Sequence, residues 1–86
     1  EVKNILELVE TIDLKVDRIL LDNMNLEEMS MAVTMVNGEI PLEASGNVTI
    51  DSVKHVASTG VDFISVGSLT HSVKAMDISF LLKTRI

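Results

Sequence analysis

The chain has 86 residues, of which 47% are hydrophobic, with no Cys, Trp or Tyr and a formal net charge of −6. This length and composition predict at most one globular domain, and the lack of Cys excludes a disulfide framework and a Cys-based zinc site. The acidic balance argues against a nucleic acid or an anionic membrane surface as partner, and no apolar stretch approaches the roughly 18 residues of a membrane span.

The first segment predicts an amphipathic helix. Apolar side chains recur at i, i+3, i+4 and i+7, the spacing of one helix face, at Val2, Ile5, Leu6 and Val9. The pattern starts at once and Glu1 is not preceded by an initiator Met, so we expect the chain to be part of a longer protein. Residues 12–16 are expected to be a short connection.

A buried strand and a capped helix are predicted next. Residues 18–23 hold three consecutive aliphatic side chains closed by a polar pair, and such an unalternating run is typical of a parallel strand buried on both faces. Asn25 then predicts a helix N-cap, and Glu28 completes a capping box. The helix is expected to end at Gly38 in the left-handed conformation. Its buried face is predicted to hold Leu26, Met29, Val33 and Val36.

The second strand–helix unit follows the same plan. Residues 39–44 predict a strand, with Pro41 near its start because proline cannot donate a ladder hydrogen bond. Thr49 is expected to cap a helix that closes at residues 59–60. The inward side chains of this helix are predicted to be Ile50, Val53, Val56 and Ala57.

The last part of the chain predicts a third strand at residues 61–67 and a short helix near residues 69–75, while the apolar run at 78–82 fits either a helix or a strand. The strand ends at Asp22, Ser45 and Gly67 recur at a near-constant interval, which indicates repeated right-handed crossovers in a parallel sheet. A small open α/β sheet would satisfy this pattern, and so would part of a barrel.

Three parallel strands alone would leave exposed edges and an uncovered face, and a complete (β/α) barrel takes about 250 residues. We therefore predict an α/β fold that is a partial (β/α) TIM-like barrel of about three parallel βα units, a fragment of a larger barrel.

The candidate chemistry lies at the carboxyl ends of the predicted strands, where parallel sheets bind their ligands. A Gly-containing turn before a helix offers free backbone N–H groups and a positive dipole end, which suit a phosphate. The turns at residues 45–47 and 67–68 would be neighbours there. They are read either as a phosphate site or as tight βα turns without a ligand. The candidate residues at these ends are Asp22, Glu43, Ser45, Gly46 and Gly67.

The role of each individual polar residue has two interpretations. Asp22 meets a ligand hydroxyl, a metal or solvent, or else forms an Asx turn or helix cap. Glu43 points either into a barrel interior or at a ligand, and His71 either donates to an anion or lies on a helix surface. His55 is expected on the surface. The methionines are expected to fill the core or an interface rather than bind a cofactor: Met24, Met29, Met31 and Met35.

Four stretches distributed along most of the chain resemble the quinolinate phosphoribosyltransferase family, in the order and spacing of that family. They are residues 18–23 (RILLDN), 42–50 (LEASGNVTI), 60–67 (GVDFISVG) and 69–79 (LTHSVKAMDIS). Asn47 and the THSVKA stretch are most similar to plant members. The resemblance therefore implies a cytoplasmic or organellar protein, plastid or mitochondrial if it is from a plant, and not a secreted one.

The resemblance implies transfer of the phosphoribosyl group of phosphoribosyl pyrophosphate to the nitrogen of quinolinate. The products would be nicotinate mononucleotide, pyrophosphate and carbon dioxide, a step of NAD biosynthesis, with Mg²⁺ accompanying the pyrophosphate. By position, Asp22 would be the catalytic acidic residue near the ribose and the metal. The phosphate-binding turns would hold Ser45, Gly46, Asn47, Gly67 and His71.

The resemblance also implies which parts lie elsewhere. Residues 1–86 would be the C-terminal part of the barrel domain, without the N-terminal domain and the early barrel strands. The basic residues that grip quinolinate would come from those parts and from a partner subunit of a homo-oligomer, so we expect the chain alone to be inactive.

Two other classes stay open at this stage. One is a different phosphate-binding barrel enzyme such as an aldolase, which needs a strand lysine, whereas Lys54 and Lys74 are predicted on helices. The other is a non-enzymatic association module that packs a partner on a Met-rich face.

Overall fold

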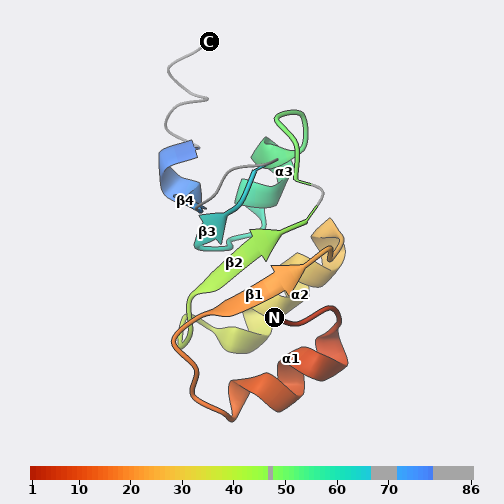
Figure 1. The fold of residues 1–86 in the computed structure, drawn as a ribbon, viewed down its shortest axis with the longest axis vertical. Helices are drawn as coiled ribbons and strands as arrows, with labels where there is room; N and C mark the ends of the chain where they lie inside the picture. The colour runs from red at the N-terminus through yellow and green to blue at the C-terminus, as the bar shows by residue number, and fades with distance from the viewer. Residues whose placement is uncertain (47, 67–71, 79–86) are drawn as a thin grey trace.

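A computed structural model describes residues 1–46, 48–66 and 72–78. The helices labelled in Figure 1 are α1 (Ile5–Ile12), α2 (Leu26–Val36) and α3 (Val53–Ser58), and residues 75–78 are also helical. The strands are β1 (Ile19–Asp22), β2 (Leu42–Ser45), β3 (Phe63–Ile64) and β4 (Val73–Lys74). Helices and strands alternate from α1 to β3, as the sequence predicts, and β4 is the next described element after β3.

The strands form one sheet in the order β1-β2-β3-β4. The first three strands are parallel, and β4 pairs antiparallel with β3. Helix α1 packs on α2 and α2 packs on α3, and α2 lies behind β1 and β2 in Figure 1. The expected α/β fold built from parallel βα units is therefore confirmed.

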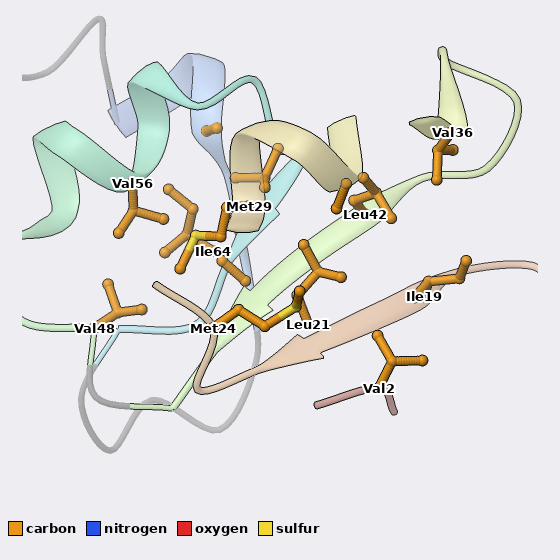
Figure 2. Close-up of a cluster of buried hydrophobic side chains, with 14 of the residues drawn as sticks. Val2, Ile19, Leu21, Met24, Met29, Val36, Leu42, Val48, Val56 and Ile64 are labelled. Carbon is orange, nitrogen blue, oxygen red and sulfur yellow. The ribbon is translucent and has the colours of Figure 1, made fainter. Parts of the chain in front are cut away.

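The two faces of the sheet differ in chemistry. Strand β1 alternates between buried and half-buried residues, so the expectation that it is buried on both faces is wrong for the described residues. The face toward the helices is apolar and forms the core shown in Figure 2. It includes Ile19, Leu21, Leu42, Ala44 and Ile64. We call the other side the open face, and it carries Leu20, Asp22, Glu43, Ser45 and Phe63.

Helix α1 begins later than the sequence pattern suggests. Val2 is not helical but pairs with Leu21 in a parallel bridge, with its N–H donating to the Leu20 carbonyl at 2.7 Å. The only fully buried residue of α1 is Leu8, whereas Leu6 and Val9 are 78% and 48% exposed. The predicted apolar face is wrong for Leu6 and Val9, because its count started at a residue that belongs to the sheet, whereas Ile5 packs against the core.

The capping signals of α2 are confirmed. Asn25 and Glu28 form the predicted capping box, and Asn37 ends the helix in the left-handed conformation with Gly38 following at positive φ. The buried residues of this helix are Met29, Ala32 and Val36. Leu26 is 43% exposed, so its predicted place in the core is wrong.

Helix α3 starts at Val53, later than predicted. Thr49 and Ser52 first close a turn in which the Ser52 N–H donates to Thr49 Oγ1 at 3.2 Å and the Thr49 N–H donates to Ser52 Oγ at 2.9 Å. This turn carries Ile50 outward, and Ile50 is 75% exposed instead of buried. Val53 and Val56 are buried as expected, and the helix ends before Gly60.

The segment after β3 also departs from the prediction. Where residues 69–75 were expected to be helical, Val73–Lys74 form β4 and cover the edge of β3, so Lys74 is a strand residue. A β-branched residue suits such an edge, and the pairing satisfies N–H and C=O groups that β3 would otherwise leave open. Residues 67–71 and 79–86 lie outside the described residues.

The contrast between two isoleucines tests this core. Ile19→Val should lower the free energy of unfolding by about 0.5–1.5 kcal/mol, since Ile19 is 1% exposed and loses packed atoms. The matched Ile50→Val, at a residue 75% exposed, should change it by less than about 0.5 kcal/mol. Urea unfolding of both variants checks this, and equal losses would contradict the placement of Ile50.

Candidate functional site

The ends of β1 and β2 meet on the open face. Asp22 is directly opposite Ser45, and the Asn23 N–H donates to the Ser45 carbonyl at 2.9 Å. Asp22 and Ser45 are both half-buried. The Asp22 carboxylate makes no hydrogen bond or ion pair with another described residue, so its oxygens are available to a ligand within this part of the chain.

Gly46 brings the two turns into direct contact. Its φ is +78°, and a Cβ added there would lie 3.0 Å from Asp22 Oδ1 and 3.1 Å from the Asn23 nitrogen. Asn23 also has a positive φ of 60°, a conformation that asparagine tolerates better than most residues. Glycine is thus required both for its backbone angle and for the close approach that sets Asp22 beside the Ser45–Gly46 turn.

The third strand end is described only in part. The Ser65 N–H donates to the Ala44 carbonyl at 2.9 Å, so the parallel pairing continues beyond β3 and puts Ser65 on the open face next to Ser45. The predicted site residues Asn47, Gly67 and His71 lie outside the described residues.

The start of α3 is separate from this site. The Val53 N–H donates to the Thr49 carbonyl at 2.8 Å, and the helix begins several residues after Gly46. Any anion held at the end of β2 would therefore use the Ser45–Gly46 turn itself rather than the α3 terminus.

Glu43 is held by partners that the sequence analysis did not identify. Arg18 Nη1 donates to Glu43 Oε1 at 2.8 Å, and Ser65 Oγ donates to Glu43 Oε2 at 3.0 Å. The Glu43 side chain is 12% exposed and that of Arg18 is 43% exposed. Glu43 thus lies on the open face with both oxygens engaged. Its partner Arg18 precedes Leu20 by two residues in the β1 segment, a spacing that indicates the same face.

The side-chain oxygens of this site suit a metal ion that binds together with a ligand better than a metal ion held by the protein alone. Among residues 1–46, 48–66 and 72–78, no group of three or more His, Cys, Asp or Glu side chains could hold an ion. Mg²⁺ commonly binds through one or two carboxylates together with substrate phosphates, and Asp22 can supply one such oxygen.

No helix of the described chain is long and apolar enough to cross a membrane.

Fold and site together define an α/β domain that presents polar side chains at the carboxyl ends of parallel strands. The chain belongs to the family described as quinolinate phosphoribosyl transferase, C-terminal domain, whose model matches residues 1–81. This finding confirms the resemblance drawn from the sequence motifs.

Named relatives agree with this assignment. Over its whole length the chain is 45% identical to the chloroplastic nicotinate-nucleotide pyrophosphorylase [carboxylating] of Oryza sativa, of which it covers 26%. It is 41% identical, again over its whole length, to a mitochondrial quinolinate phosphoribosyltransferase [decarboxylating] of Nicotiana tabacum, of which it covers 27%.

A solved structure of the Francisella tularensis nicotinate-nucleotide pyrophosphorylase matches with a TM-score of 0.74 and 42% identity over 85% of this chain. The chain covers 27% of that structure, so it spans about a quarter of the length of the relatives it matches.

Two glycines with the same backbone angle provide a test of the contact between the turns. Gly38 has φ +79° with nothing within 4 Å of an added Cβ, so Gly38→Ala should cost about 1 kcal/mol of stability from its backbone angle alone. Gly46→Ala, at φ +78°, should cost about 2–3 kcal/mol because Asp22 and Asn23 must also move. Urea unfolding of both variants measures the difference. Equal costs would contradict the close approach.

Proposed function

We propose that the chain is the C-terminal portion of a quinolinate phosphoribosyltransferase, an enzyme that makes nicotinate mononucleotide, carbon dioxide and pyrophosphate from quinolinate and phosphoribosyl pyrophosphate in NAD biosynthesis. The observation that carries the proposal is the contact between Asp22 and the Ser45–Gly46 turn in a chain of this family. A carboxylate and an anion-binding turn at one place suit a ligand that has both a ribose and a phosphate.

The parent fold that we propose is a (β/α) barrel. Its support is that strands adjacent in the sequence are adjacent in the sheet, with the crossover helices packed against one another. A doubly wound sheet would have helices on both faces. In a barrel the open face would become the interior, and Asp22 and Ser45 would lie at its carboxyl-terminal rim.

The proposed role of Asp22 is electrostatic. As pyrophosphate leaves, C1 of the ribose gains positive charge, which the carboxylate stabilises. A carboxylate and a unit positive charge about 4 Å apart gain about 4 kcal/mol at an effective dielectric constant of about 20, or close to a thousandfold in rate. Ser45 and the backbone at Gly46 would hold the ribose phosphate. Asp22 is the described residue that would help to hold Mg²⁺ with the pyrophosphate, and the ion would supply positive charge for the leaving group.

The net charge of −6 fits a shared site. An enzyme for anionic substrates needs arginine and lysine side chains, so we propose that these come from the remaining three quarters of the parent protein and from a partner subunit of a homo-oligomer. For the compartment we propose a plastid or mitochondrion, as the names of the rice and tobacco relatives state for those proteins, or the cytoplasm.

A second candidate function is association with a partner protein. Met31 and Met35, at i and i+4 on α2, are 49% and 40% exposed, while Met24 and Met29 are buried. This exposed pair favours an interface on the outer side of α2, and the two functions are compatible in one protein.

The aldolase hypothesis no longer has support, because the family is that of a phosphoribosyltransferase. This holds although Lys74 is a strand residue, as the lysine of an aldolase would be.

The isolated chain should form no detectable nicotinate mononucleotide from quinolinate and phosphoribosyl pyrophosphate, because the basic half of the site lies elsewhere. Chromatographic detection of the product checks this, with the Francisella tularensis enzyme as positive control. Product formation by the 86-residue chain would contradict the proposed division of the site.

The role of Asp22 can be tested in a chimaera in which the chain replaces the matching quarter of the Francisella tularensis enzyme. The chimaera should be active, and Asp22→Asn should lower kcat by about 10²–10³-fold, the effect of losing a charge that acts in the transition state. Asp17→Asn, the same change at an exposed residue before β1, should retain kcat within about threefold.

A folded but inactive chimaera, or equal activity of the two variants, would overturn the proposed function. If the full chimaera does not fold, a graft of residues 18–46 alone contains the described turns of β1 and β2 and serves the same comparison.

A further inference from the structure

The guanidinium of Arg18 connects all the strands of the described sheet. It extends from the residue before β1 to Glu43 in β2 at 2.8 Å, and its Cζ lies 3.8 Å from the ring centroid of Phe63 in β3. The same Nη1 donates to Ser72 Oγ, next to β4, at 3.3 Å. Arginine can make these contacts and lysine cannot, because the planar guanidinium stacks on an aromatic ring while its edge donates hydrogen bonds.

The carboxylate that this group holds is close to the site but is not directed to a ligand. Glu43 precedes Ser45 by two residues on the same face of β2, which corresponds to about 6.6 Å along a parallel strand. Its charge is thus within a Debye length of any ligand at Ser45, about 8 Å at physiological salt. Both Glu43 oxygens are already engaged, so Glu43 would act on that ligand through its field alone.

The charges on this face balance only when Arg18 is present. Among the described residues of this face, Asp22 and Glu43 are the carboxylates, and Lys74 lies opposite Phe63, which places it on the same face. Without Arg18, two negative charges would face one positive charge where a phosphorylated ribose has to bind. A ligand with several negative charges would then be repelled.

We propose that Arg18 is a positioning residue for the anionic substrate: it cancels the charge of Glu43 and fixes that carboxylate, so that Asp22 is the one carboxylate of the described open face with its oxygens unengaged and offered to phosphoribosyl pyrophosphate. This role rests on the proposed function. It makes Glu43 a partner of Arg18 and Ser65 rather than a ligand-binding group.

A double-mutant cycle in the chimaera described above tests the role. Arg18→Met should raise KM for phosphoribosyl pyrophosphate about tenfold at low salt, less at high salt, and leave kcat within about threefold. Arg18→Met combined with Glu43→Gln should return KM to within about threefold of the starting value, because the unbalanced charge is gone. Arg18→Lys should fall between the two. Lys54→Met, the same loss of charge on the exposed side of α3, should leave KM unchanged.

The isosteric Glu43→Gln variant gives an independent check, since it leaves Arg18 in place. It should leave KM for phosphoribosyl pyrophosphate unchanged or lower it. A raised KM in this variant, or a double variant as impaired as Arg18→Met, would overturn the proposal. So would a fall in kcat at constant KM.

Activity of the unmodified chimaera decides the proposed function by itself, and only the differences among its variants decide the role of Arg18. A folded but inactive chimaera overturns both. If Arg18→Met does not fold, Glu43→Gln and Arg18→Lys still decide the role of Arg18.

Discussion

The parallel register between β1 and β2 is the constraint on which the rest of the structure depends. Pairing Ile19 with Leu42 and Asp22 with Ser45 puts the buried apolar side chains of these strands toward the helices and every polar one, together with Leu20, on the open face. A slip of one residue would exchange the two faces, burying Asp22 and exposing Leu21. Core and site are therefore specified by one set of hydrogen bonds, and neither can change without the other.

The open face separates two uses of a carboxylate. Asp22 lies at the strand end without a described partner, whereas Glu43 lies one row lower, largely buried and bonded at both oxygens. Among the described residues, the same functional group is thus without a hydrogen-bonding partner at the strand end and part of the scaffold two residues earlier. The difference is set by what the neighbouring strands supply: a glycine turn beside Asp22, and a guanidinium with a serine beside Glu43.

Sequence reasoning succeeded where the signal was local. The capping box at Asn25, the end of α2 and the strands β1 and β2 each depend on a few consecutive residues. The structure has the cap and the helix end as predicted and both strands in place, although β2 begins at Leu42 rather than at residue 39. It failed where a distant contact decides. Val2 joins the sheet through β1, so the predicted face of α1 was wrong, and residues 73–74 pair with β3 instead of forming a helix.

The candidate site shows the same division. Asp22, Ser45 and Gly46 are predicted from the turns they form, and the structure brings these three residues together, while their role in binding stays a prediction. The contacts of Arg18 were missed because its partners Glu43, Phe63 and Ser72 are far away in the sequence, and no local pattern shows such a pairing.

The bridge at Val2 has a consequence for the dynamics of the site. The Asp22 N–H donates to the Val2 carbonyl at 2.8 Å on one side of β1, and the next amide, that of Asn23, donates to Ser45 on the other side. Two successive amides at the end of a strand, where backbones usually fray, are thus anchored to different neighbours. Two amides anchored in this way are expected to exchange their hydrogens as slowly as amides in the middle of a strand. The catalytic candidate therefore sits on backbone that opens only when the sheet itself opens, and a ligand would meet a carboxylate that is already in place.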